Sequence, residues 1–172
     1  MVVVVMGVSG AGKTTVGKLL AAALGFDFLD ADELHSRQNV EKMARGVPLT
    51  DADRAGWLKL VRNRVETYLK EGREAVVACS ALREDYRDYL RVDPQAVQFV
   101  YLKGEYPLLK ERLDQRRHHF MPPGLLLSQL DTLEDPNDAL IIGIDQPPEQ
   151  LVKEIRRGLG LGLDEHPDKE CT

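Results

Sequence analysis

The chain carries at residues 7–14 the stretch Gly7-Val8-Ser9-Gly10-Ala11-Gly12-Lys13-Thr14, which matches the pattern G-x-x-x-x-G-K-[ST]. An apolar run at residues 2–6 precedes it and predicts a buried strand, and a helical pattern follows it at residues 13–24. Glycines let the backbone curl so that its N–H groups point at phosphate oxygens, and the next helix adds its positive N-terminal end. The stretch therefore predicts a phosphate-binding loop. The alternative, a glycine-rich turn without a ligand, is disfavoured by the flanking strand and helix.

The residues of this loop have distinct expected roles toward a nucleotide. Lys13 would contact the β- and γ-phosphates of ATP as a catalytic residue, and the Thr14 hydroxyl would bind Mg²⁺. Contacts to the phosphates are expected from the whole loop and the start of the helix, that is from Gly7, Val8, Ser9, Gly10, Ala11, Gly12, Lys13, Thr14 and Thr15. ATP and Mg²⁺ are accordingly the expected cofactors.

Five short apolar runs, rich in Val and Ile and mostly unalternated, are typical of parallel strands buried on both faces. They lie at residues 2–6, 26–29, 75–79, 97–102 and 140–144. Helical patterns lie between and after them at residues 13–24, 32–45, 51–70, 83–91, 105–117 and 148–159. This order predicts an α/β fold, a three-layer α/β/α sandwich around a five-stranded parallel sheet of the P-loop kinase type. With 172 residues there is room for a single domain, expected at residues 1–159, followed by a polar tail at residues 160–172.

Two helical segments exceed a minimal alternation of strands and helices, and we interpret both as insertions that cover ligands. The first spans about residues 32–70, contains a Gly46-Val47-Pro48 break and is the expected substrate-binding insertion. The second spans about residues 112–134 and is the expected lid. Kinases that exclude water from the transferred phosphate need covers of this kind.

The composition limits the classes of partner and compartment. The chain is 43% hydrophobic and 30% charged, as ordinary globular proteins are, and its net charge of -5 offers no broad basic surface to a nucleic acid. The apolar start is too short for a signal peptide or a membrane span, and Cys79 and Cys171 make no disulfide framework. We therefore expect a cytoplasmic protein without nucleic-acid or membrane partners.

Two aspartates follow the second predicted strand, at the edge of a parallel sheet where ligands collect. Asp30 could hold Mg²⁺ through water, and Asp32, directed similarly, could accept the proton of an attacking hydroxyl as a catalytic and substrate-binding residue. The alternative is that Asp30 or Asp32 caps the next helix, as aspartate often does.

An acidic acceptor would also need cations, because a carboxylate must be neutralised where it binds. Arginine is the best geometric match, since its planar fork can donate two hydrogen bonds at once. The candidate substrate-binding residues are His35, Lys42, Arg54, Arg83 and Arg87, about two of which are expected to touch the substrate, the others being solvated surface charges. Core packing is the default role of the single tryptophan, Trp57.

A basic pair, Arg112 and Arg116, lies four residues apart on one predicted helix face. The spacing could place Arg112 against adenine and Arg116 on the phosphates, where it would act as a catalytic residue by stabilising transition-state charge. The alternative is a basic face paired with Glu111 or Asp114. His118 and His119 are a weak metal site, because no third ligand is spaced to join them.

Beyond the phosphate loop, the sequence resembles the gluconokinases, relatives of shikimate and adenylate kinases within the P-loop fold. The match covers roughly residues 4–158 and rests on segments spread along the chain. These are Leu29-Asp30-Ala31-Asp32-Glu33-Leu34-His35, Asn39-Val40-Glu41-Lys42-Met43, Gly46 to Arg54 with Trp57-Leu58, Cys79 to Arg83, Tyr86-Arg87-Asp88, Tyr101 to Gly104, Ser128-Gln129-Leu130 and Thr132-Leu133-Glu134. The loop alone could not separate the kinases of this fold, whereas these segments together can.

The resemblance implies ATP-dependent phosphorylation of D-gluconate to 6-phospho-D-gluconate in carbohydrate metabolism, with Mg²⁺, in the cytoplasm and commonly as a homodimer. Likeness to shikimate kinases implies that Asp32 lies near the accepting hydroxyl and Asp30 near the metal. Likeness to adenylate kinases implies that Arg112 lies by the adenine and Arg116 on phosphate. One departure is His118-His119-Phe120 where Gly-His-Phe is expected, which restricts the backbone of the lid.

Two other functions remain open at this point. One is a kinase for another small acid or a nucleotide, such as shikimate or a nucleoside monophosphate. The other is a binding module that holds ATP without turnover, against which the paired Asp30 and Asp32 and the two insertions argue.

Overall fold

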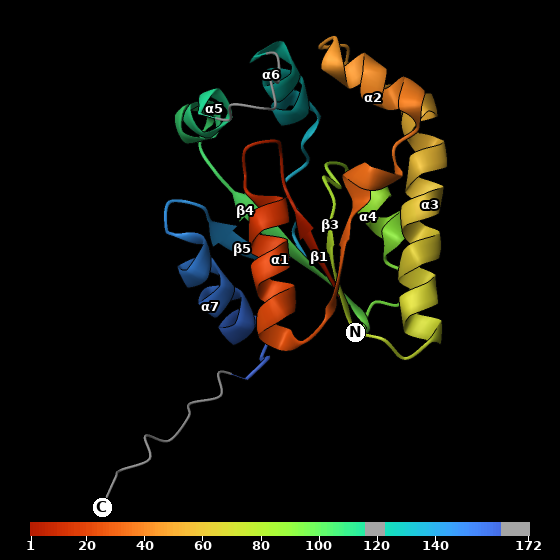
Figure 1. The fold of residues 1–172 in the computed structure, drawn as a ribbon, viewed down its shortest axis with the longest axis vertical. Coiled ribbons are helices and arrows are strands. Elements are labelled where there is room, and N and C mark those ends of the chain that lie inside the picture. The colour runs from red at the N-terminus through yellow and green to blue at the C-terminus, as the bar shows by residue number, and fades with distance from the viewer. Residues whose placement is uncertain (116–122, 163–172) are drawn as a thin grey trace, which may run out of the picture.

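The computed structural model describes residues 1–115 and 123–162. A five-stranded, entirely parallel sheet in the order β2-β3-β1-β4-β5 forms its centre (Figure 1). The strands are β1 (Val2–Met6), β2 (Asp27–Asp30), β3 (Ala75–Ala78), β4 (Val97–Lys103) and β5 (Leu140–Gly143). The helices are α1 (Lys13–Leu24), the 3-10 helix η1 (Ala31–Leu34), α2 (Arg37–Ala44), α3 (Asp51–Lys70), α4 (Glu84–Leu90), α5 (Tyr106–Asp114), α6 (Pro123–Thr132) and α7 (Pro148–Gly158). The predicted α/β fold with five parallel strands is confirmed.

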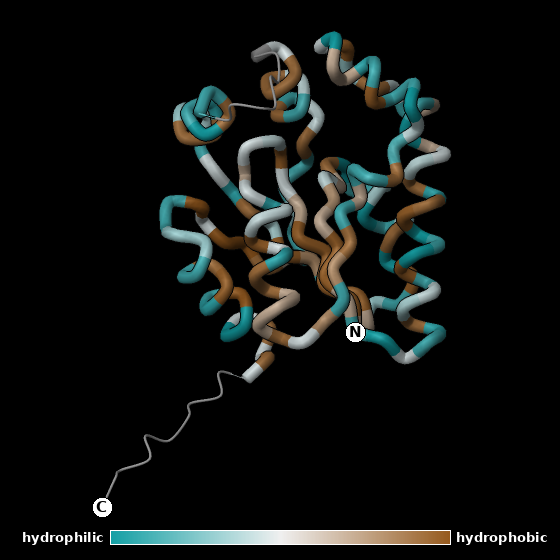
Figure 2. Tube along the Cα trace, viewed as in Figure 1, coloured by the Kyte–Doolittle hydropathy of each residue, from teal (hydrophilic) through white to brown (hydrophobic). Residues whose placement is uncertain are grey.

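The central strand β1 is apolar at every position because the sheet is covered on both faces. Its five residues are fully buried, and alternate side chains point to opposite faces. Val3 and Val5 belong to one hydrophobic cluster, and Val2, Val4 and Met6 to the other. Figure 2 shows the hydrophobic colour concentrated along the central strands. Each fully buried valine contributes about 1.5–3 kcal/mol relative to an exposed one.

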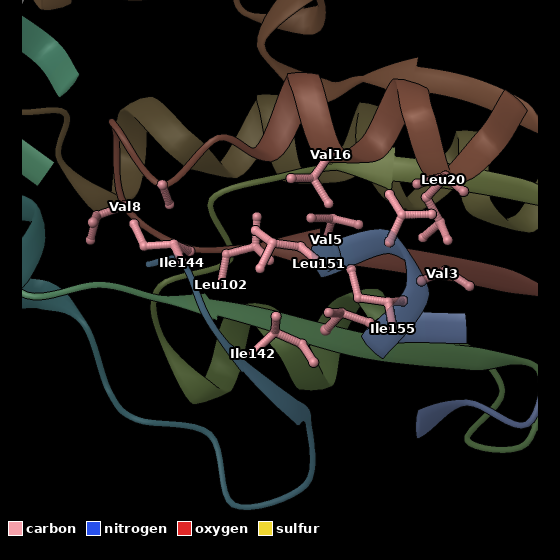
Figure 3. Packing of buried hydrophobic residues seen from close by; sticks show 14 of the residues in the cluster. Val3, Val5, Val8, Val16, Leu20, Leu102, Ile142, Ile144, Leu151 and Ile155 are labelled. Atoms are coloured by element: carbon pink, nitrogen blue, oxygen red, sulfur yellow. The ribbon is translucent and has the colours of Figure 1, made fainter. Parts of the chain in front are cut away.

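Different helices cover the two faces of the sheet. Figure 3 shows one cluster, in which Val3 and Val5 lie with Leu20 of α1 and Ile155 of α7. The other cluster joins the opposite face to α3 and α4, with Trp57 and Val61 of α3 among its buried side chains. The result is the predicted sandwich of three layers, with α1 and α7 on one side and α3 and α4 on the other (Figure 1).

The helix predicted at residues 32–45 is instead two elements, η1 and α2. Two N-caps lie within seven residues, because the Asp30 side chain accepts the Asp32 N–H and the Ser36 hydroxyl accepts the Asn39 N–H. Between them His35 has extended backbone, which ends the first turn before α2 begins. The prediction of one continuous helix was therefore wrong at this point.

The phosphate loop and the helices α2, α5 and α6 all lie at one end of the sheet, the upper end in Figure 1. This is the carboxyl end of the parallel strands, where ligands bind in open α/β sheets.

Smaller differences from the predictions concern the ends of elements, since β2 begins and ends one residue later than predicted and the described part of α5 ends at Asp114. Within the described residues, no helix combines the length and the apolar character that crossing a membrane requires.

Candidate functional site

The phosphate loop between β1 and α1 has the curled backbone that its glycines permit. Gly7, Gly10 and Gly12 have φ angles of 142°, 87° and 93°, which side-chain-bearing residues rarely adopt. A Cβ on Gly10 would lie 2.8 Å from the Leu109 carbonyl oxygen, so α5 packs directly against the loop. Gly12 is the N-cap of α1 and has no side chain to occupy the first amides of that helix. The loop therefore fits phosphate groups both in backbone shape and in helix polarity.

The Lys13 ammonium lies back across this loop, where it donates a hydrogen bond to the Val8 carbonyl oxygen at 3.1 Å. Neighbouring backbone contacts hold the loop in place, since Gly7 donates its N–H to Ser80 and Ala11 donates its N–H to Val8, both at 3.3 Å. The Gly7 bond joins the loop to the segment after β3. The Val8 bond keeps the positive charge of Lys13 against the loop that is expected to bind the phosphates.

The two residues predicted to hold Mg²⁺ are in direct contact. Thr14 donates its hydroxyl hydrogen to Oδ2 of Asp30 at 2.7 Å, while Oδ1 of Asp30 accepts the Asp32 N–H at 3.1 Å. Asp30 thus also has the capping role that was the alternative reading of this residue. Hydroxyl and carboxylate oxygens suit Mg²⁺, which takes few protein ligands and relies on phosphate and water oxygens for the rest. Among residues 1–115 and 123–162, no cluster of three or more His, Cys, Asp or Glu side chains forms another metal site.

A pocket adjoins the loop on the side of β2 and α3, and we call it the acceptor pocket. Five of the residues predicted for the site line it together, namely Ser9, Lys13, Asp32, His35 and Arg54. The remaining lining residues come from six different segments: Met43, Pro48, Leu49, Trp57, Ser80, Leu82, Tyr86, Leu125, Ser128 and Gln129. The pocket therefore combines one carboxylate, of Asp32, two cations, of Lys13 and Arg54, and apolar walls directly beside the phosphate loop.

One wall of the acceptor pocket is a stack of two rings. His35 and Trp57 lie parallel, with centroids 4.4 Å apart, and the indole N–H donates to the Ala31 carbonyl oxygen at 2.7 Å. Trp57 is 4% exposed, so the default prediction of core packing is met, and its contact with His35 adds a role at the site. Burial lowers the pKa of His35, and the nearby Arg54 lowers it further, whereas Asp32 raises it. His35 therefore enters the pocket as a neutral ring near pH 7.

Arg54 reaches the pocket from the first turn of α3. Its guanidinium lies 3.5 Å from the Tyr86 hydroxyl and 3.7 Å from a carboxylate oxygen of Asp51, both long contacts. Tyr86 donates its own hydrogen to Asp51 at 2.5 Å, and this bond is the main cause of the lowered pKa of Asp51. Tyr86 and Asp51 thus orient the Arg54 guanidinium. Because both contacts are long, its N–H groups can still donate hydrogen bonds to an anionic ligand.

The other three predicted substrate-binding cations have partners elsewhere and do not line the pocket. Lys42 pairs with both carboxylate oxygens of Asp53, at 2.7 and 2.8 Å. Arg83 pairs with Asp51 at 2.9 Å and with Asp85 at 3.0 Å. Arg87 is only 3% exposed and donates to backbone carbonyl oxygens.

Arg87 holds the turn between β3 and α4. Its guanidinium donates to the carbonyl oxygens of Ala81 and Leu82, both at 3.1 Å. Ala81 has a φ of 43°, a conformation that is costly for a residue with a side chain. The arginine therefore satisfies the carbonyls of a strained turn that itself borders the acceptor pocket through Leu82.

A second cleft lies on the other side of the loop, between α1, α5 and α7. Five of the predicted nucleotide-binding residues line it, namely Gly10, Ala11, Gly12, Thr15 and Arg112, together with Val16, Gln115, Gln146, Pro148 and Leu151. Arg112 donates to the Ile144 carbonyl oxygen at 2.5 Å, while Asp114 pairs with Lys110 and Glu111 accepts from Gln115. The alternative pairing of Arg112 with those acids is thus not the observed one. Arg116, His118 and His119 lie outside the described residues.

Comparisons with known proteins decide between the kinases of this fold. The sequence matches the shikimate kinase family over residues 9–157. A gluconokinase of Gluconobacter oxydans is 46% identical over 157 residues, which span 90% of this chain and 88% of its own. The thermoresistant gluconokinase of Escherichia coli is 41% identical over 153 residues, which span 87% of each chain. The chain belongs to the shikimate kinase family, and within it to the gluconokinases.

The fold agrees with this membership of the gluconokinases. The crystal structure of a gluconokinase from Sinorhizobium meliloti 1021 superposes with a TM-score of 0.83 at 44% identity. The superposition covers 92% of this chain and 91% of the other, so no large part of either fold lacks a counterpart. The suspected resemblance to gluconokinases is confirmed.

Several residues of this gluconokinase site were not predicted as functional from the sequence. Gln129 of α6 reaches the phosphate loop, Tyr86 and Asp51 orient Arg54, and Leu125 and Ser128 complete the acceptor pocket. Signals for four of them were present, because Asp51, Tyr86, Ser128 and Gln129 lie in segments that carry the family resemblance. Nothing in their local pattern shows which loop they contact.

Proposed function

We propose that this protein transfers the γ-phosphoryl group of ATP to D-gluconate, which yields 6-phospho-D-gluconate and ADP. The observation that supports it most is the identity of 46% and 41% to two gluconokinases over nearly the whole chain. The arrangement of the site agrees with it, because the acceptor pocket and the phosphate loop share Ser9 and Lys13. A hydroxyl bound in this pocket would meet the terminal phosphate without crossing bulk solvent.

Within the acceptor pocket, we assign the roles by chemistry. Asp32 is the carboxylate that would take the proton from the attacking hydroxyl, as the general base. Arg54 is the cation that would bind the gluconate carboxylate, since its fork can donate two hydrogen bonds. His35, neutral and stacked on Trp57, would donate or accept a single hydrogen bond with a sugar-acid hydroxyl.

On the nucleotide side, the loop amides and Lys13 would hold the β- and γ-phosphates, and Arg112 would line the adenine side. Thr14 and Asp30 would hold Mg²⁺, which when bound neutralises charge on the phosphate oxygens. The family resemblance assigns Arg116 to the spreading charge of the transferred phosphoryl group. Lys13 would act on the same charge from within the loop.

The organisation of the chain is part of the proposal. Residues 1–159 would be a single domain, since both hydrophobic clusters flank one sheet. The segment at about residues 32–70 would be the substrate-binding insertion, because it supplies His35, Arg54 and Trp57 to the pocket. The predicted lid, about residues 112–134, lies partly outside the described residues. A cytoplasmic homodimer is proposed on the strength of the family resemblance alone.

The direct test is ADP formation by the purified protein in the presence of Mg²⁺, ATP and one candidate acceptor at a time. We expect ADP formation with gluconate and a far lower rate with shikimate or nucleoside monophosphates. The Lys13→Ala variant should show no turnover with any acceptor. The product should carry its phosphate on the terminal hydroxyl, as read by phosphorus NMR. ATP binding by titration calorimetry with no turnover on any sugar acid would instead favour the binding module.

A further inference from the structure

Gln129 of α6 makes a contact that no motif of the phosphate loop predicts. The Ser9 N–H donates to Oε1 of Gln129 at 2.7 Å, which joins residues 120 positions apart in the chain. Ser9 stands between Val8, which accepts from Lys13, and Gly10, which packs on α5. The bond therefore ties α6 to the part of the loop that faces the acceptor pocket.

The same face of α6 forms a wall of that pocket. Leu125, Ser128 and Gln129 all line it, and their spacing of three and four residues places them on one side of the helix. Leu125 and Leu126 are buried, so the helix is seated by apolar contacts as well. Gln129 is thus the point at which one helix face touches both the acceptor pocket and the phosphate loop.

The chain just after α6 is held separately. The Glu134 N–H donates to the Leu82 carbonyl oxygen at 2.8 Å, and the Glu134 carboxylate accepts the Glu84 N–H at 2.6 Å. These bonds fasten the end of the segment to the turn between β3 and α4. Because the chain after α6 is held at Glu134, the contact between Gln129 and Ser9 sets the position of the pocket-lining face of α6, with Leu125 and Ser128, relative to the phosphate loop.

We propose that Gln129 is a positioning residue, which holds the phosphate loop and the α6 wall of the acceptor pocket in one fixed arrangement. This inference rests on the proposed function for its kinetic consequences. An amide oxygen suits the task because it accepts the Ser9 N–H without adding negative charge beside bound phosphates. A carboxylate of the same length would keep the bond but repel the nucleotide.

The first test compares Gln129→Leu with the wild-type protein. Loss of one hydrogen bond should lower kcat/KM for gluconate about fivefold, with the ATP dissociation constant within about twofold. Exchange of the Ser9 amide hydrogen, followed by NMR without substrates, should speed up by a similar factor. Asp131→Asn, on the exposed side of the same helix, is the matched control and should leave all three quantities unchanged.

The second test is Gln129→Glu, which keeps an acceptor oxygen at the same reach. Protection of the Ser9 amide should return to the wild-type level without nucleotide, whereas ATP should bind about tenfold more weakly because of like charge. The proposal is overturned if Gln129→Leu leaves both amide exchange and kcat/KM unchanged, or if the glutamate variant restores no protection. Since amide exchange needs no substrate, it still tests the contact if the wild-type protein proves inactive toward gluconate.

Discussion

The Thr14 hydroxyl and the Asp30 carboxylate lie 2.7 Å apart and join the first turn of α1 to the end of β2. The same carboxylate caps η1 through its other oxygen, 3.1 Å from the Asp32 N–H. One side chain therefore positions the proposed metal site and the proposed general base together. The two proposed metal-binding residues, Thr14 and Asp30, and the proposed base, Asp32, thus share one short hydrogen-bonded chain.

Asp30→Asn should separate the two tasks of this aspartate. Asparagine caps a helix as well as aspartate does, so the free energy of unfolding should change by less than about 0.5 kcal/mol. The loss of negative charge should raise the Mg²⁺ concentration needed for half-maximal turnover by about tenfold. Mg²⁺ titrations of ADP formation and urea unfolding measure the two effects. An unchanged Mg²⁺ requirement would remove Asp30 from the metal site.

Asp32→Asn should lower the rate far more than it weakens ATP binding. A missing general base costs about 10²- to 10⁴-fold in kcat, whereas the nucleotide contacts of the loop are untouched. Steady-state kinetics and titration calorimetry with ATP measure the two quantities. The adjacent exposed carboxylate offers a control, Glu33→Gln, which should keep nearly full activity. Full activity in Asp32→Asn would exclude the base role.

Arg54→Lys should raise KM for gluconate about tenfold, with kcat reduced less. Lysine keeps the positive charge but loses the planar pair of donors that matches a carboxylate. The same substitution at Arg64, an exposed position of the same helix, is the control. Initial rates over a range of gluconate concentrations give KM for each variant. Equal KM values for Arg54→Lys and Arg64→Lys would mean that the gluconate carboxylate does not bind at Arg54.

Arg87→Met should act on stability and not on substrate binding. The substitution leaves two buried carbonyl oxygens, of Ala81 and Leu82, without their donor, which should cost about 2 kcal/mol of unfolding free energy. Urea unfolding monitored by circular dichroism measures the change, with the exposed Arg157→Met as control. A large rise in KM for gluconate with unchanged stability would instead return Arg87 to the substrate site.

Stability should fall in acid partly through the Asp53 carboxyl. The Lys42 hydrogen bond, helped by Thr50, lowers the pKa of Asp53 from 3.8 to about 2. Because the folded form holds this proton less tightly, the contribution is present above pH 4 and is lost as the pH falls toward 2. In Lys42→Met the decline in unfolding free energy between pH 4 and 2 should be shallower. Parallel declines in both proteins would contradict this assignment.

The accuracy of the sequence predictions varies with how local the signal is. The loop at residues 7–14 was predicted correctly because its glycines adopt backbone angles that other residues avoid. The break at His35 was missed, since two capping residues within seven positions compete with an otherwise helical pattern. The sequence was least informative about the five candidate substrate-binding residues. His35 and Arg54 line the acceptor pocket, whereas the sequence could not separate them from Lys42, Arg83 and Arg87.

The order of the elements, the phosphate loop, the two aspartates after β2 and the family followed from the amino-acid sequence. Each rests on periodicity, on turn conformation or on segments of matching residues, all of which are encoded locally. The choice of Arg54 over Arg87, and the bond between Gln129 and Ser9, depended on how helices pack around the sheet. Such contacts join residues far apart in the chain, and a side chain's partner is set only when its helix is seated.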